Sequence, residues 1–144
     1  MPLTFLISNY DSPYIPLAMQ LRYEVFILEQ SVPLELELDG LDKEAIHIFA
    51  IDNNKVFGTL RMTKYLDSLK IARVCVSKQC RNQGIGMKML EKAIEYAKGK
   101  EYHYIIIESQ ISVINFYKKF GFQTEGEMFM DAGIPHIQMI KRIL

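Results

Sequence analysis

The sequence predicts a single α+β domain, a mixed β-sheet with helices on both faces. The chain has 144 residues, a common length for one domain, so we expect residues 1–144 to fold together. Hydrophobic residues make up 49% of the chain, which suffices for an ordinary core. The β-like and helical runs do not alternate strictly, and this order favours a mixed sheet over a doubly wound parallel one.

The N-terminal part predicts one strand and one helix. A short apolar run from Leu3 to Ile7 is typical of a first strand. The segment 17–28 carries apolar residues at helical spacing, which predicts a helix with one buried face. These residues are Leu17, Leu21, Val25 and Leu28. The next segment, residues 29–44, is acidic and interrupted by proline and glycine, so we expect a loop with at most one helical turn.

The middle of the chain predicts three strands and a long helix. The β-rich runs are Ala45 to Ile51, Lys55 to Lys64 and Leu69 to Ser77. Three polar residues, 52–54, separate the first two runs and predict a hairpin. Residues 87–98 repeat apolar side chains every three or four positions, so we expect an amphipathic helix with Gly99 as its C-cap.

The C-terminal part predicts a strand, a short helix and two further strands. The expected elements are a strand at 102–107, a helix at 112–120 that Gly121 ends, and two β-like runs within 128–144 that are broken at 131–135. A β-rich tail offers an exposed edge to a second subunit, so a homodimer stays open.

Composition and charge narrow the classes of partner. The chain has 17 basic and 17 acidic residues, and this balance gives no reason to expect nucleic acid or an anionic membrane. Cys75 and Cys80 lack the spacing of a zinc site, so we expect no metal and two reduced thiols. The N-terminus has no signal-peptide pattern, and no apolar run approaches the roughly 20 residues that span a bilayer. We therefore expect a cytoplasmic protein.

The segment from Arg81 to Gly86 has the composition of a phosphate-binding turn. It lies between a hydrophobic run and a predicted helix, and its two glycines allow positive φ and close approach to a ligand. Free N–H groups and the helix dipole then favour an anion at the helix start, and an arginine can add a charge-assisted hydrogen bond. The spacing alone equally fits an ordinary tight turn. A dinucleotide fingerprint would place Met89 at its third glycine, and the Walker lysine and hydroxyl are missing after Gly86.

Two motifs in this order resemble the GNAT superfamily of N-acetyltransferases. Arg81-x-x-Gly84-x-Gly86 is similar to its acetyl-CoA signature, Q/R-x-x-G-x-G/A. The segment 115–122 resembles its F-Y-x-x-x-G-F segment. Further similarity to the small bacterial ElaA-like branch covers nearly the whole chain from Leu17 onwards. It rests on residues 21–30, Glu35, Asp39, Asp42, His47, 58–61, Ser109, Gln110 and 133–136.

The resemblance implies a GNAT fold, whose mostly antiparallel sheet splays at the cofactor strand, and acetyl-CoA as cofactor. It implies that the cofactor's arm pairs with the strand before the turn, as an added strand would. The Val74 N–H would face the thioester oxygen and stabilise the oxyanion. Gln110 stands where many family members have asparagine. The implied cofactor-binding residues are Val74, Cys75, Val76, Arg81, Asn82, Gln83, Gly84, Ile85, Gly86, Gln110, Phe116 and Tyr117.

Acetyl transfer also needs an acid and a base. The resemblance implies that Tyr117 protonates the departing thiolate, since a phenol with a pKa near 10 keeps its proton at neutral pH. His136 or His47 could act as base directly or through water, and the carboxylates of the acidic loop stay open as alternatives. For the catalytic set we predict Tyr117, His136 and Val74.

The prediction of the acceptor site depends on how the acidic loop is interpreted. The acidic loop is either a solvated surface or the lining of a pocket that attracts a cationic amine. The predicted acceptor-binding residues are Glu29, Glu35, Asp39, His47, Arg73 and His136.

The sequence therefore predicts an N-acetyltransferase that moves an acetyl group from acetyl-CoA to a small primary amine, by direct attack in a ternary complex. The alternative is a catalytically silent protein that binds CoA as a sensor or interaction module. The identity of the amine stays open among sugar amines, polyamines, amino-acid derivatives and protein termini.

Overall fold

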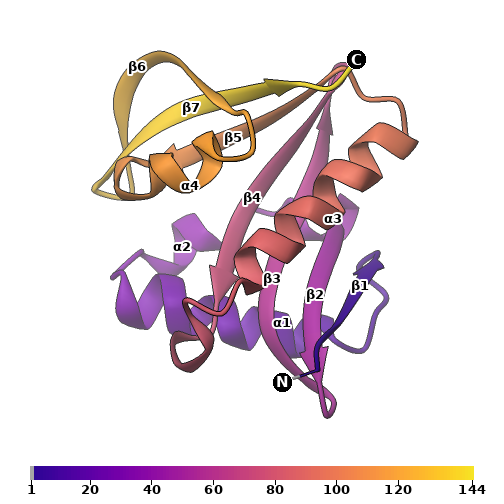
Figure 1. Ribbon diagram of the computed structural model, residues 1–144. Coiled ribbons are helices and arrows are strands. Elements are labelled where there is room, and N and C mark those ends of the chain that lie inside the picture. The colour runs from indigo at the N-terminus through magenta and orange to yellow at the C-terminus, as the bar shows by residue number, and fades with distance from the viewer. Residues whose placement is uncertain (1) are drawn as a thin grey trace.

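The structure is a computed structural model that describes residues 2–144 (Figure 1). Its strands form one sheet in the order β1-β2-β3-β4-β5-β7-β6. Neighbouring strands are antiparallel except β4 and β5, which are parallel. The strands are β1 Thr4–Ser8, β2 Ile46–Asp52, β3 Lys55–Tyr65, β4 Ser68–Val76, β5 Tyr104–Gln110, β6 Gln123–Asp131 and β7 Ile134–Arg142. The predicted mixed sheet is confirmed.

Helices cover both faces of this sheet. The α-helices are α1 Ile15–Arg22, α2 Leu34–Glu37, α3 Ile85–Gly99 and α4 Ile114–Lys118. A π-helical segment, η1 Tyr23–Glu29, continues α1, and short 3₁₀ segments are η2 Asp42–Glu44, η3 Lys78–Cys80 and η4 Ile111–Val113.

The core has two parts because successive side chains of a strand point to opposite faces of the sheet. On β2, Ile48 packs into the larger cluster, which includes the buried face of α3, whereas Phe49 packs into the smaller cluster with α1. Gly58 on β3 permits close packing of α3. A Cβ atom at this glycine would lie 3.0 Å from the Ile85 side chain and 3.1 Å from that of Met89.

A gap between β4 and β5 is the feature that positions the site (Figure 1). The two strands pair only from Ser68 opposite Tyr104 to Ile71 opposite Ile107. Beyond this point β4 stays with β3, and β5 stays with β7. The register of β3 and β4 shifts between Thr59 and Arg61, and Arg73 of β4 has a φ of 57° at this bulge. A bulge bends its strand, which here separates β4 from β5.

The elements differ from the sequence prediction at several boundaries. The helix predicted at 17–28 is α-helical only to Arg22 and π-helical afterwards. Strand β6 begins at Gln123, earlier than predicted. Gly99 lies inside α3 and is not its cap: the chain instead turns at Glu101, with a φ of 62°, and the Tyr102 N–H donates to the Ala97 carbonyl at 3.0 Å. This bond gives the helix a Schellman end without glycine.

Candidate active site

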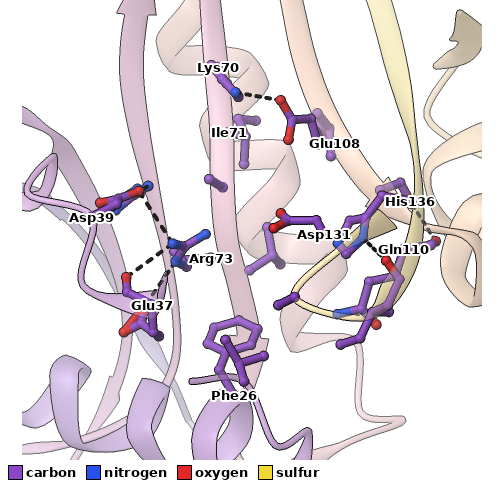
Figure 2. A pocket seen from close by; sticks show the side chains of 18 of the residues that line it. Phe26, Glu37, Asp39, Lys70, Ile71, Arg73, Glu108, Gln110, Asp131 and His136 are labelled. Atoms are coloured by element: carbon purple, nitrogen blue, oxygen red, sulfur yellow. Dashed lines mark hydrogen bonds and ion pairs between the residues drawn. The ribbon is translucent and has the colours of Figure 1, made fainter. Parts of the chain in front are cut away.

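A cavity of about 420 Å³ opens between the diverging ends of β4 and β5. Figure 2 shows its two sides, with Glu37, Asp39 and Arg73 on one and Gln110, Asp131 and His136 on the other. Its lining also includes side chains of η1, α4 and the loop that follows η1. The volume fits a small acceptor together with one arm of a cofactor.

The N-terminus of α3 lies next to this gap and is open. Gly84 is its N-cap with a φ of 79°, and none of the residues 2–144 caps the helix with a side chain. A Cβ atom at Gly84 would meet no described atom within 4 Å outside the neighbouring backbone, so the space beside this residue is open. Gly86 brings the first turn close to the aromatic segment, because a Cβ there would lie 3.5 Å from the Phe116 ring. Uncapped N–H groups at a helix start fit the diphosphate of CoA.

Arg81, at the start of this turn, is held in place by two partners. Its Nη1 and Nη2 donate to the Glu29 carboxylate at 2.6 Å and 2.7 Å. Its Nε donates to the Val76 carbonyl at 3.1 Å. Hydrogen bonds from Arg81 lower the pKa of Glu29, so this pair is ionised at neutral pH.

Tyr117 is buried on α4 and lines the cavity. Its side chain is 6% exposed, and burial raises the pKa of its phenol to about 12. The ring makes edge contacts with Phe116 and Phe122, at centroid distances of 5.1 Å and 6.0 Å. Among residues 2–144 no group forms a hydrogen bond with the hydroxyl, which remains able to donate to a ligand.

His136 on β7 has a fixed tautomer. Its Nδ1 lies 2.7 Å from the Ile134 carbonyl oxygen, and a carbonyl only accepts hydrogen bonds, so Nδ1 carries the proton. The neutral ring therefore has its lone pair on Nε2. The Phe129 ring stacks on the imidazole at a centroid distance of 5.8 Å and restricts its rotation.

An ionic network stabilises the opposite wall. Arg22 is 1% exposed and binds the carboxylates of Glu37 and Asp42, both at 2.6 Å. Glu37 also accepts from Arg73, at 2.8 Å. Arg61 is bonded to Asp39 and, at 3.2 Å, to Asp42. Three arginines thus balance three carboxylates.

This network changes the interpretation of the acidic loop. Burial alone would raise the pKa of Asp39, but hydrogen bonds from Arg61 and the Leu41 amide and the charges of Arg61 and Arg73 lower it to about 2. Arginines form ion pairs with Glu37, Asp39 and Asp42, so these carboxylates add no unpaired negative charge to the cavity. The loop is a structural wall of the pocket.

The predicted acceptor-binding residues divide into two groups. Asp39, Arg73 and His136 line the cavity, whereas Glu29, Glu35 and His47 do not. Glu29 is bonded to Arg81, and Glu35 is exposed on the outer side of α2. The His47 side chain is buried, with Nε2 2.9 Å from the Asp42 carbonyl oxygen, and burial lowers its pKa.

The predicted cofactor residues surround the gap. Val74, Gln110 and Tyr117 line the cavity itself. Cys75 faces away from it and packs with Leu21 and Val25. The remaining ones lie in β4, the turn before α3, the first turn of α3 and α4: Val76, Arg81, Asn82, Gln83, Gly84, Ile85, Gly86 and Phe116.

Sequence reasoning missed two features of the cavity. Asp131, at the end of β6, lines it and has no ion-pair partner among the described residues. Lys70 and Glu108 form an ion pair of 2.7 Å that joins β4 to β5 where the gap begins (Figure 2). The only local signal for Asp131 was its place before a turn, which Ala132 and Gly133 form with φ values of 52° and 76°.

No cluster of three or more His, Cys, Asp or Glu side chains among residues 2–144 has an arrangement that would hold a metal ion. None of the helices in the same range combines the length and apolar character that a membrane crossing requires.

Comparison with known proteins agrees with this geometry. Residues 14–143 match the family described as "Acetyltransferase (GNAT) domain". The chain is 41% identical over 128 residues to the "Uncharacterized N-acetyltransferase YjcF" of Bacillus subtilis, covering 86% of this chain and 89% of that protein. It is 31% identical over 134 residues to "Protein ElaA" of Escherichia coli, covering 88% and 86% respectively.

Solved structures show the same fold. An "Acyl-CoA N-acyltransferase from Pseudomonas aeruginosa" superposes with a TM-score of 0.90 at 28% identity, covering 97% of this chain and 99% of that one. Escherichia coli ElaA gives a TM-score of 0.88 at 27% identity, with the same coverage of both chains. With the fold, the two motifs and these relatives in agreement, the chain belongs to the GNAT family of acetyl-CoA-dependent N-acetyltransferases.

Proposed function

We propose that this protein transfers an acetyl group from acetyl-CoA to the primary amine of a small acceptor, by direct attack in a ternary complex. The observation that carries the proposal is the cavity between β4 and β5. It lies next to an uncapped helix N-terminus, and the Tyr117 hydroxyl and the His136 imidazole share its lining.

The donor side of the site would be held by backbone groups. Acetyl-CoA, when bound, supplies the acetyl group as a reactive thioester. The N–H groups at the start of α3 bind its diphosphate, and Arg81 adds positive charge. The edge of β4 that no longer pairs with β5 receives its arm, and the Val74 N–H donates to the carbonyl oxygen. One fixed donor of this kind lowers a barrier by roughly 3–4 kcal/mol.

Two side chains would move the protons. Nε2 of His136 accepts a proton from the acceptor's ammonium group and leaves a neutral nucleophile. The Tyr117 hydroxyl donates its proton to the departing sulfur, and the phenolate regains a proton from the attacking nitrogen, which loses its second proton as the amide forms. Because burial raises the pKa of this phenol to about 12, it remains protonated throughout the working pH range.

The cysteines support direct attack over an acetylated enzyme. Cys75 and Cys80 are both buried in the described chain. Burial raises the pKa of Cys75 to about 12, so this residue offers no thiolate at neutral pH.

The charge of the cavity favours a cationic acceptor. Among the charged groups of its lining, the arginines pair with Glu37 and Asp39, and Lys70 pairs with Glu108. Asp131 is left as an uncompensated carboxylate that points into the cavity (Figure 2). A carboxylate in this position attracts an ammonium group.

Strand β6 is a candidate interface between two copies of the chain. This strand is the outer edge of the sheet and exposes Met128 and Met130. Unpaired edges of this kind pair readily with another chain, so we propose a homodimer through β6. Light scattering of the purified protein is expected to give twice the monomer mass, and a monomer at micromolar concentration would rule this dimer out.

The function is tested by free-thiol release from acetyl-CoA with a panel of primary amines, with the product identified by mass spectrometry. We expect amine-dependent release and an acetylated product. If CoA raises the melting temperature while no amine in the panel is acetylated, the silent CoA-binding alternative holds instead.

A further inference from the structure

We propose that Glu29 and Gln30 are positioning residues. They hold in place the two edges of the gap between β4 and β5, where the cofactor would bind. This inference rests on the acetyl-CoA site of the proposed function. Both residues stand at the end of η1, yet their side chains reach opposite edges. Glu29 reaches the turn before α3 through Arg81, and Gln30 reaches the end of β5 through Gln110.

The backbone at this point is unusual. The Gln30 N–H donates to the Val25 carbonyl at 3.1 Å, a spacing of five residues, and the Val32 N–H donates to the Phe26 carbonyl at 2.8 Å. Ser31 has a φ of 60°, which ends the π-helix abruptly. π-Helical turns are rare and occur frequently at functional sites. Here the wide turn directs the side chains of Glu29 and Gln30 to opposite edges of the gap.

Glu29 restricts the position of Arg81 without using all of its donors. The bidentate contact and the bond to Val76 occupy three of the five N–H groups of the guanidinium. Two N–H groups remain for a phosphate. The Arg81 and Glu29 side chains are each 35% exposed, so without the pair the arginine would sample many rotamers in solvent. Glu29 thereby lowers the entropy cost of binding the diphosphate.

Gln30 fixes the other edge. Its Oε1 accepts a hydrogen bond of 3.0 Å from Nε2 of Gln110, the last residue of β5. This bond orients the Gln110 amide and leaves its Oε1 as an acceptor for an amide N–H of the cofactor's arm. The two residues therefore affect the binding of different parts of the ligand. Glu29 positions Arg81 for the diphosphate, and Gln30 positions Gln110 for the arm.

The test compares two ligands with two variants. Affinities for CoA and for pantetheine, which lacks the diphosphate and the nucleotide, are measured by titration with Glu29→Gln and Gln30→Leu. Glu24→Gln is the matched control, because Glu24 is on the same π-helix and accepts a surface hydrogen bond of 3.3 Å, but from Gln20 of α1 and not from the turn before α3. Urea unfolding of each variant verifies that the fold is intact.

For Glu29→Gln we expect a Kd for CoA raised about five- to tenfold, the scale of immobilising one rotamer-rich side chain, with the Kd for pantetheine within about twofold of wild type. Gln30→Leu should weaken both ligands. The inference is overturned if Glu29→Gln leaves the CoA affinity unchanged or improves it, or if it weakens both ligands equally. Wild-type protein that binds no CoA would instead refute the proposed function, and the inference with it.

Discussion

The two walls of the cavity differ in how their polar groups are used. On the wall built from α1, η1 and α2 with β3 and β4, every charged group that lines the cavity is paired, and the deepest pairs are almost fully buried. On the wall built from α4, β6 and β7, the Tyr117 hydroxyl, Nε2 of His136 and the Asp131 carboxylate have no partner among residues 2–144. The paired wall therefore provides shape, whereas the unpaired wall is available for chemistry.

The largest effect, a loss of unfolding free energy, is expected from a substitution that removes ion pairs of the paired wall. Arg22→Met leaves the buried carboxylates of Glu37 and Asp42 without their main partner, and a broken buried pair costs about 3–5 kcal/mol of unfolding free energy. Urea denaturation measures this loss. Lys92→Met is the control, because its pair with Glu95 is on the surface and contributes under about 1 kcal/mol. Equal effects of the two variants would contradict the assigned role of the network.

The next effect is expected on the unpaired wall. Tyr117→Phe keeps the ring contacts but removes the acid, so kcat should fall about 10²-fold while stability and CoA affinity stay near wild type. Steady-state kinetics at saturating substrates measure this change. Tyr96→Phe on α3, outside the cavity, serves as the control. An unchanged kcat would remove Tyr117 from the mechanism.

A smaller effect, on the KM for the acceptor, should follow from a substitution of Asp131. Asp131→Asn removes the uncompensated charge of the cavity, and we expect the KM for a cationic amine to rise about three- to tenfold, with little change in kcat. The effect should shrink at high salt, because a partly exposed charge is screened. Glu127→Gln, on the same strand but outside the cavity lining, is the comparison. A KM independent of this substitution would show that the acceptor carries no charge there.

The smallest effect concerns pH. The pKa of Asp39 is lowered from 3.8 to about 2 in the fold, so its contribution to stability is complete above about pH 4 and is lost as pH falls through about 2. Wild-type protein should therefore lose more unfolding free energy between these pH values than Asp39→Asn does. Urea titrations at several pH values provide the measurement, and parallel pH profiles of the two proteins would contradict the pairing.

The local structure of the proposed donor half was largely predictable from the sequence. The glycine turn before α3 and the aromatic segment of α4 are local patterns, and their local geometry follows from the residues themselves. The helix at 17–28 was less predictable: its periodicity placed Leu28 on the buried face, whereas Leu28 is 63% exposed. The π-helical turn shifts the register, and tertiary contacts impose it.

The acceptor half could be predicted only in part: Asp39, Arg73 and His136 line the cavity, but the ion pairs of its wall join distant residues. Sequence reasoning treats a lone arginine as a surface residue, yet Arg22 is among the most buried side chains of the protein. The same holds for one contact on the proposed donor side, where Glu29 meets Arg81 across 52 positions of the chain and no spacing rule indicates it. His47 looked like a base until its burial beside Asp42 became visible.

The central claim is that the acetyl group passes directly to an amine without forming an acetylated enzyme. Rapid mixing of the protein with acetyl-CoA, with free thiol followed in time, tests it most directly. If transfer is direct, no thiol is released in the absence of amine, and turnover is steady once amine is added. A burst of one thiol per protein molecule before any amine is present would contradict it, because a covalent acetyl-enzyme would then precede transfer.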